Sequence, residues 1–148
     1  MKVLLLVLAF VLGILASTVL QGEEIAIKML KTNNEHRAAQ GLGPQQLDPE
    51  LAKLAQSWSE HMAVTGRYNH SGYPYAEIIF AGPTTVEDAF GGWLNSRAHA
   101  SIMLGGSTSC GFGHAVGSNG THYWTGIYSG GDYTPTHRRR LFRRRRWR

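Results

Sequence analysis

The sequence of 148 residues has one cysteine, no internal repeat and few acidic residues, and each of these features excludes some classes of protein. Because Cys110 has no second cysteine to pair with, no disulfide can form within the sequence, and the fold must depend on packing alone. The hydrophobic fraction of 43% with 10% aromatic residues excludes wholesale disorder. This length and composition predict one domain with a single core.

Acidic residues are absent from residues 137–148, which contain eight arginines. Without these eight charges the net charge of +5 becomes −3, so the basic character belongs to an Arg-rich C-terminal tail, residues 131–148. A nucleic-acid footprint across the domain is therefore not expected. Leu141, Phe142 and Trp147 among the arginines are typical of a segment that contacts an anionic membrane; the alternative is a solvated extension without a partner.

Polar residues are almost absent from residues 3–20, which follow Lys2. A cleavable signal has an apolar run of about 7–15 residues and a membrane-spanning helix needs about 20, and this run lies between them. Small residues at 16–18 favour cleavage. Residues 1–22 are thus predicted to be a signal peptide or an N-terminal signal anchor. Either reading predicts a secreted, extracellular or periplasmic domain, membrane-anchored in the second case.

Three helices are predicted in the domain, residues 23–130. The first spans residues 23–40, with two acids at its start and Gly41 after its end. Asn34 and Arg37 continue its apolar stripe, which predicts that they hydrogen-bond to neighbouring loops. Residues 41–47 are predicted to be a loop.

The second helix begins with a capping sequence, Asp48-Pro49-Glu50, and ends at Gly66. Its apolar stripe has helical spacing and consists of Leu51, Leu54, Ala55, Trp58 and Met62. The third, short helix is predicted to start at a capping box, Thr84 to Glu87, and to bury Val86, Phe90, Trp93 and Leu94. Ser96 is predicted to cap a further turn that carries His99.

A hairpin is predicted around Asn119-Gly120, with residue 118 facing residue 121. This register places Phe112 with Tyr123 and Ile127 on one face, and Trp124 with Tyr128 on the other, among glycines that allow close packing. Both faces are apolar, so helices must cover both. The predicted fold class is α+β, a three-layer α-β-α sandwich with a small, mainly antiparallel central sheet.

Three residues are candidates for a functional site: His70 after the second helix, Glu77 in the predicted first strand, and His99. Two imidazoles and a carboxylate are the ligand types of an open divalent-metal site, such as a zinc site. The alternative is that both histidines are hydrogen-bonded structural residues. Ser71 and Ser96 lie near these histidines, but no nucleophile-elbow glycine pattern surrounds either serine.

The remaining histidines are predicted to have other roles. His114 shares the face of Phe112, which predicts a packed, hydrogen-bonded histidine. His36, His61 and His122 are predicted to lie at the surface.

The order of several short motifs resembles the CAP superfamily, or SCP domain: cysteine-rich secretory proteins, antigen 5 and pathogenesis-related proteins. The resemblance covers about residues 28–129, and the lack of disulfides is similar to the bacterial-type branch. The motifs are Asn34-Glu35-His36-Arg37, Leu47-Asp48-Pro49-Glu50-Leu51, Tyr68-Asn69-His70-Ser71, Tyr75-Ala76-Glu77-Ile78-Ile79, Trp93-Leu94-Asn95-Ser96-Arg97-Ala98-His99, Cys110-Gly111-Phe112-Gly113 and Tyr123-Trp124.

The resemblance implies an α-β-α sandwich with a cleft that carries His70, His99 and Glu77. The chain departs from the family pattern at Ala76 and Ile78, where relatives have glycine and asparagine, and at Ser96, where many have a second glutamate. The favoured function is an exported, non-catalytic binding module whose cleft holds a divalent metal, a lipid, a peptide or a cell-surface partner. One alternative is a metal-dependent hydrolase with His70 and His99 as ligands and Glu77 as general base. Another is a membrane-active protein that acts through its tail.

Overall fold

A computed structural model describes the backbone of residues 2–130 and the side chains of residues 21–130. The described elements are α1 (Lys2–Ala39), β1 (Gln46–Leu47), α2 (Pro49–Thr65), β2 (Ala76–Ala81), α3 (Val86–Asn95), α4 (Arg97–Met103), β3 (Ser109–Val116) and β4 (His122–Ser129). The predicted C-terminal tail lies outside these residues. Within residues 21–130, no helix is long and apolar enough to cross a membrane.

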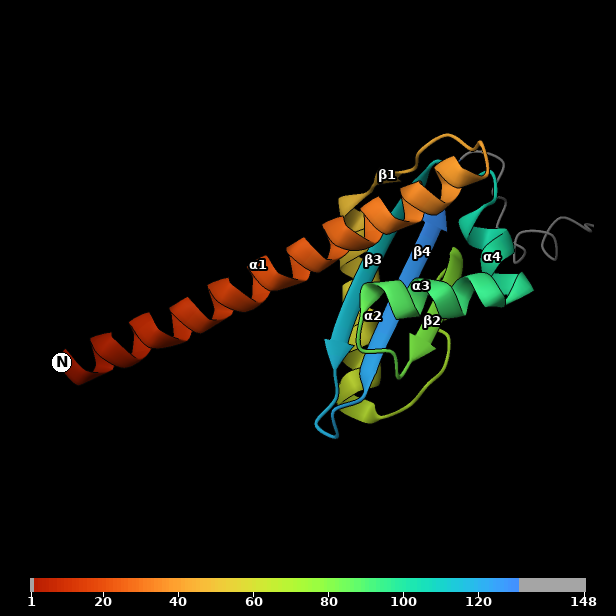
Figure 1. The fold of residues 1–148 in the computed structure, drawn as a ribbon. Coiled ribbons are helices and arrows are strands. Elements are labelled where there is room, and N and C mark those ends of the chain that lie inside the picture. Colours follow the sequence, from red (N-terminus) through yellow and green to blue (C-terminus); the bar gives the residue numbers. More distant parts are fainter. Residues whose placement is uncertain (1, 131–148) are drawn as a thin grey trace, which may run out of the picture.

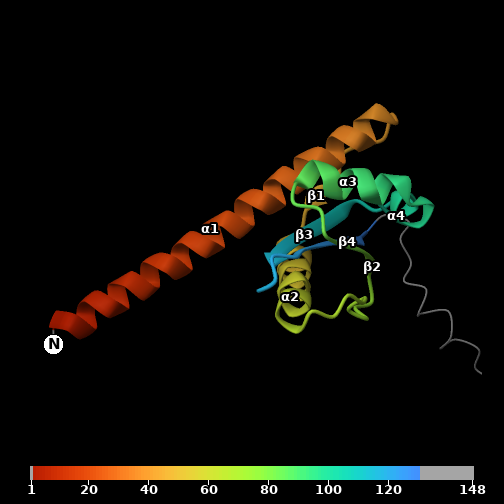
Figure 2. The same ribbon diagram turned by 60° about the horizontal axis from the view of Figure 1, so that its bottom comes forward.

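The strands form one sheet in the order β1-β3-β4-β2, with helices on both faces (Figures 1 and 2). Seen edge-on, α1 and α3 lie on one face and α2 lies on the other (Figure 2). The predicted α+β sandwich is therefore present, but its sheet is mixed rather than mainly antiparallel. The difference comes from β1, which pairs in parallel with β3 inside the segment predicted to be a loop. Two residues leave too little pattern to show a strand in the sequence.

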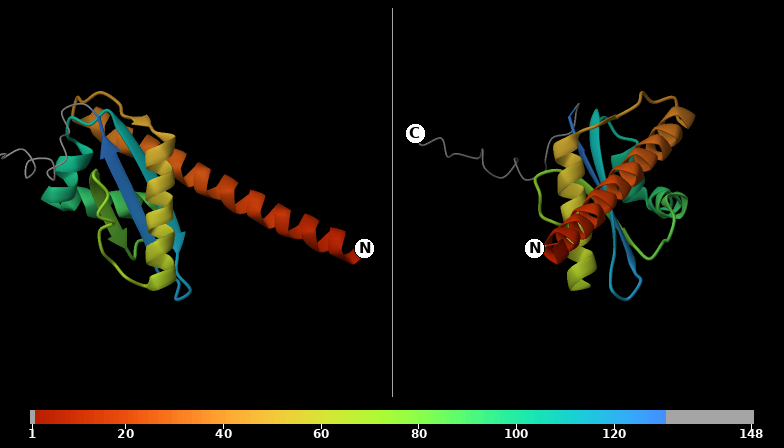
Figure 3. Two further views of the ribbon diagram at one scale, coloured as in Figure 1. Left: turned by 180° about the vertical axis from the view of Figure 1, so that it is seen from behind. Right: turned by 90° about the vertical axis from the view of Figure 1, so that its left-hand side faces the viewer.

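Helix α1 begins at Lys2 rather than at residue 23, and it runs without a break from residue 2 to Ala39 (Figure 3). Gly22 is the nearest helix-weakening residue, and one glycine costs only about 1 kcal/mol relative to alanine. The hydrogen bonds predicted from this helix to neighbouring loops are confirmed. Arg37 is buried and donates to the carbonyl oxygens of Gly43, Met103 and Gly105 at 2.8–2.9 Å. Asn34 exchanges two hydrogen bonds with the backbone of Gln45.

Helix α2 has the predicted ends. The Asp48 carboxylate accepts from the backbone N–H groups of Glu50 and Leu51, and Gly66 ends the helix in the left-handed conformation. Helix α3 is capped one residue later than predicted, because Thr85 rather than Thr84 accepts from the N–H of Asp88. Its predicted core residues Val86, Phe90 and Trp93 are buried.

The hairpin register is shifted by one residue from the prediction. Val116 pairs with His122, so the loop is residues 117–121, closed by hydrogen bonds between Gly117 and Thr121 and between Gly120 and Gly117. Only Gly120 in this loop has a positive φ, whereas the two-residue turn expected from the sequence needs one at Asn119 as well. A shift of one residue reverses every side chain. Phe112 thus shares a face with Trp124 and Tyr128 in the core beneath α1 and α3.

Two glycines let α2 pack directly on β3. A Cβ atom at Gly111 would lie 2.1 Å from the backbone nitrogen of Ala52, and one at Gly113 would lie 2.3 Å from that of Gln56. Because no side chain fits in these spaces, the helix backbone rests against the strand backbone. The close packing expected over the strand glycines is confirmed, and it fixes α2 against β3.

Candidate functional site

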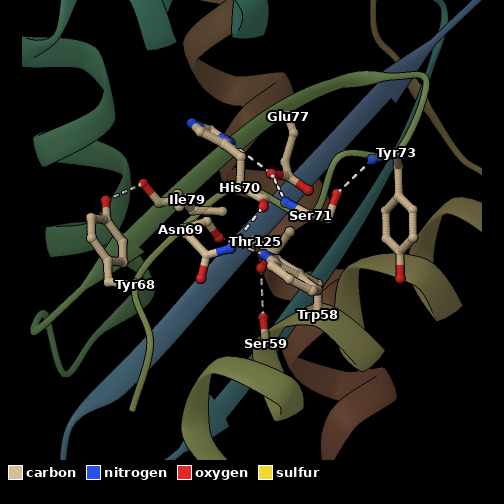
Figure 4. Close-up of polar contacts among 10 residues, drawn as sticks. All are labelled: Trp58, Ser59, Tyr68, Asn69, His70, Ser71, Tyr73, Glu77, Ile79 and Thr125. Atoms are coloured by element: carbon tan, nitrogen blue, oxygen red, sulfur yellow. Dashed lines mark hydrogen bonds and ion pairs between the residues drawn. The ribbon is translucent and has the colours of Figure 1, made fainter. Parts of the chain in front are cut away.

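His70 and Glu77 are in direct contact on the α2 side of the sheet. The Nδ1 atom of His70 lies 2.6 Å from Oε1 of Glu77, and the same oxygen accepts a hydrogen bond from the backbone N–H of Ser71 at 3.0 Å (Figure 4). Glu77 is in β2 opposite Ile127, which packs against α2. The Glu77 side chain is only 6% exposed, whereas that of His70 is 60% exposed. A buried carboxylate therefore holds an exposed imidazole by one ring nitrogen, which leaves Nε2 free of this contact.

The loop that carries His70, residues 66–75, is fixed by aromatic side chains. The indole N–H of Trp58 donates to the carbonyl oxygen of Asn69 at 2.9 Å, and the Tyr68 hydroxyl donates to that of Ile79 at 3.0 Å (Figure 4). Tyr73 packs edge-on against Trp58. The apolar spacing of α2 predicted Trp58 only as part of its core stripe, and this hydrogen bond to the loop was not predicted. The available signal was its place near the end of the stripe, where the helix meets the loop.

His99 is half-buried on the short helix α4. Burial lowers its pKa below the ordinary histidine value, and the nearby charge of His70 lowers it further. A lowered pKa favours the neutral imidazole, which is the form that a metal ligand requires.

Two buried polar atoms of this site make no hydrogen bond within the protein: Oε2 of Glu77 and Nδ1 of His99. An unsatisfied buried polar atom costs about 1–3 kcal/mol, so such atoms usually bind water or an ion. The donor types fit a divalent metal ion. Even so, no three His, Cys, Asp or Glu side chains of residues 21–130 are grouped as a metal-ligand set. The three-ligand set of His70, Glu77 and His99 stays a prediction.

Neither serine beside these histidines is arranged as a nucleophile. The hydroxyl of Ser71 accepts from the backbone N–H of Tyr73 at 3.0 Å, which shapes the loop (Figure 4). Ser96 occupies the predicted cap position of α4, but its side chain makes no capping bond. A separate cavity of about 500 Å³ lies between α1 and α2, and its lining includes Ala26 and Phe112 but none of the three candidate residues.

The other histidines are partly as predicted. His114 is half-buried on the face of Phe112 and hydrogen-bonds to His122, which confirms the packed role. His122 is half-buried by this contact rather than a plain surface residue. His61 is exposed and stacks on Trp58.

The sandwich, with a histidine and a carboxylate at the edge strand, has the architecture of a known class of domain. A model of the cysteine-rich secretory protein (CAP) family matches residues 30–128, and the chain therefore belongs to this family. Pathogenesis-related protein 1 of Arabidopsis thaliana is 33% identical over 72 residues, 47% of this chain and 45% of that protein. The matched region thus spans about half the length of this relative.

Solved structures have the same fold. An outer surface protein from Borrelia burgdorferi has a TM-score of 0.62 and 14% identity, over 70% of this chain and 90% of that one. An extracellular protein with an SCP domain from Bacillus anthracis has a TM-score of 0.58 and 21% identity, over 73% of this chain and 41% of that one. At these identities the likeness shows the fold alone.

Proposed function

We propose that this chain is an exported CAP module that binds a divalent metal ion, zinc by preference, through His70 and His99, and that it acts by binding rather than by catalysis. The observation that carries the proposal is the contact of an exposed imidazole with a buried carboxylate whose Oε2 has no hydrogen-bond partner. Nδ1 of His99, on α4, is a second buried polar atom without a partner. These atoms make the site receptive to a small polar or charged occupant.

Each residue has a distinct part in this proposal. Glu77 holds Nδ1 of His70, which fixes the ring and leaves Nε2 as the metal ligand. This carboxylate–histidine arrangement is common around protein-bound metals, where it orients the ring and raises its basicity. His99 supplies the second imidazole. Glu77 is then a positioning residue and not a ligand. When bound, the ion supplies a Lewis-acidic centre with open positions for water or a partner group.

A hydrolase is less well supported, because the predicted general base is already engaged. Glu77 Oε1 accepts from both His70 and Ser71, and the side chain is almost fully buried. A base must reach the proton that it removes, at about 2.6–3.2 Å or through one water. Only the buried Oε2 is uncommitted in the described contacts. This geometry favours a carboxylate that positions a ring over one that shuttles protons.

The partner of the module is proposed to be a peptide, a lipid or a cell-surface group that contacts the exposed rim of the site. Tyr68 is 52% exposed beside the exposed His70, which gives the rim aromatic and polar surface. Export is proposed from the apolar residues 3–20 and from relatives described as extracellular or outer surface proteins. Contact of the Arg-rich tail with anionic membranes is a separate proposal that depends on its sequence alone.

Zinc calorimetry on the full chain tests the metal part of the proposal. We expect one binding event that is lost in the double variant His70→Ala plus His99→Ala and retained in the control His36→Gln. Occupancy should fall as the solution is acidified, because a protonated imidazole cannot bind a metal ion. The absence of zinc binding, or binding unchanged in the double variant, would contradict the proposal.

A further inference from the structure

A second pair of histidines lies at the hairpin, on the opposite face of the sheet from Glu77. His114 in β3 is paired with Trp124, and His122 in β4 with Val116, so the two histidines are diagonal neighbours on one face. Nε2 of His114 lies 2.9 Å from Nδ1 of His122, and both side chains are half-buried. Because Glu77 points to the α2 side, this pair is separate from the site described above.

His114 is held by two neighbouring side chains, one at its backbone and one at its ring. Beyond the two-residue β1, the outer edge of β3 has no neighbouring strand among the described residues, and the Gln56 side chain takes its place. Gln56 donates to the carbonyl oxygen of His114 at 2.9 Å and accepts from its N–H at 3.0 Å. The indole of Trp124 packs on the His114 ring with centroids 4.0 Å apart, and is itself anchored by a 2.7 Å bond to Pro83. The backbone of His114 is therefore fixed, and its ring packs against an indole.

The spacing of the two nitrogens suits a metal ion of a particular geometry. At metal–nitrogen bonds of about 2.0–2.1 Å, adjacent corners of a square lie roughly 2.8–3.0 Å apart and two corners of a tetrahedron roughly 3.3–3.4 Å apart. The two nitrogens lie 2.9 Å apart, joined by a hydrogen bond in which one donates to the other. A bound ion would replace this bond: the donor ring would take its other tautomer, and both rings would turn so that the two lone pairs face the ion.

We propose that His114 and His122 form a second metal site, which takes a Cu²⁺ ion in a square-planar or tetragonal arrangement. Two imidazoles favour Cu²⁺ over the other divalent first-row ions, by the general order of affinities. No third His, Cys, Asp or Glu of residues 21–130 completes a group here, so water fills the remaining positions. The stack of Trp124 on His114 makes this indole a built-in reporter, because bound Cu²⁺ quenches a fluorophore in contact with its ligand.

The test is a CuCl₂ titration of the full chain, followed by tryptophan fluorescence and by electron paramagnetic resonance. His70→Ala plus His99→Ala is the background, so that the other site does not contribute. We expect quenching with one bound ion in this background and a tetragonal spectrum with nitrogen ligands. Adding His122→Gln should weaken binding at least about tenfold, and adding the control His36→Gln should leave it unchanged.

His122→Gln changes a half-buried side chain near the loop, so we expect it to fold, and circular dichroism checks this. Should it not fold, the spectrum of the background protein decides the outcome. Two imidazole nitrogens in that spectrum support the site, and one or none overturns it. Equal Cu²⁺ affinity with and without His122 would also overturn the proposal.

Discussion

The two faces of the sheet each carry a paired histidine, and the pairs differ in what the ring touches. On the α2 face, exposed His70 contacts the carboxylate of Glu77, which is 6% exposed. On the other face, His114 contacts a second imidazole and an indole, and the pKa of His114 is lowered to about 4 by burial and by His122. A carboxylate partner can orient a ring for metal binding, whereas an imidazole partner disfavours a second proton. The residue that contacts each histidine therefore decides which ligand the histidine can bind.

The largest effect is expected from Gly113→Ala, which forces α2 away from the strand that holds His114. The added Cβ would lie 2.3 Å from the backbone nitrogen of Gln56, and a helix backbone cannot yield as a side chain does. Overpacking typically costs about 1–3 kcal/mol, and we expect about 3 kcal/mol or more here. Urea unfolding measures this loss. The control is Gly91→Ala, where no atom outside the backbone of its own helix lies within 4 Å of the new Cβ. Equal stability of the two variants would contradict the close packing.

The next effect is expected from Glu77→Gln, which removes the charge from the α2-face pair but keeps its shape. Loss of a carboxylate that orients a ligand histidine lowers metal affinity about 10–100-fold. We expect this fall in zinc affinity by calorimetry, with no change in Cu²⁺ binding at the other pair. The matched control is Glu87→Gln, whose carboxylate pairs with Lys28 at the surface at 2.9 Å. If Glu77→Gln binds zinc as the unchanged protein does, Glu77 does not position His70.

Local signals in the sequence were enough to predict α2 and the third helix. The Asp48 cap and the terminal Gly66 act within a few residues of their own positions, so the ends of α2 can be predicted from the local sequence. The hairpin register is different. It depends on a loop that begins at Gly117 and on Trp124, whose indole N–H binds Pro83 some 41 residues away. Asn119-Gly120 correctly predicted a hairpin, but the predicted register was wrong by one residue. This error assigned the side chains of one strand to the wrong face of the sheet.

The candidate site was also only partly visible in the sequence. His70 and Glu77 are close in sequence, and a loop followed by a strand brings them together. That Glu77 is buried and holds the ring depends on α2 and on Trp58, which contacts the loop through Asn69. The link to His99 came from the family resemblance, because no periodic pattern connects a loop residue with a helix that follows two other elements. The contact between His114 and His122 was missed because it needs the correct register.

Cys110 extends the comparison to a buried group with no strong polar partner. It lies on the same face as His114, and its Sγ–Gln46 oxygen distance of 3.7 Å is a weak contact. Burial raises the pKa of this thiol from 9.0 to about 12, although the charge of Arg37 lowers it slightly. A raised folded-state pKa means that stability is complete below about pH 9 and is lost as the pH rises towards 12.

At pH 10 we expect this linkage to remove about 1.4 kcal/mol of the free energy of unfolding, since the thiol ionises only in the unfolded chain. Urea unfolding at pH 8 and pH 10 measures the loss, and Cys110→Ala should abolish that part of the pH dependence. The native thiol should also resist iodoacetamide at pH 8 until urea unfolds the protein. Rapid alkylation of the folded protein would show that Cys110 is not buried in this way.

The smallest effect is expected from Gln56→Ala, which removes the side chain that holds the backbone of His114. Both hydrogen bonds, at 2.9 and 3.0 Å, lie at a partly exposed strand edge, where water replaces much of what is lost. We expect a loss of about 1 kcal/mol of stability and a Cu²⁺ affinity a few-fold lower, because His114 becomes more mobile. Ser57→Ala, an exposed position on the same helix, is the control for helix effects. Zinc affinity at His70 should not change in either variant. A fall in zinc affinity equal to that for Cu²⁺ would mean that the two faces are coupled through α2, and that the pairs are not independent.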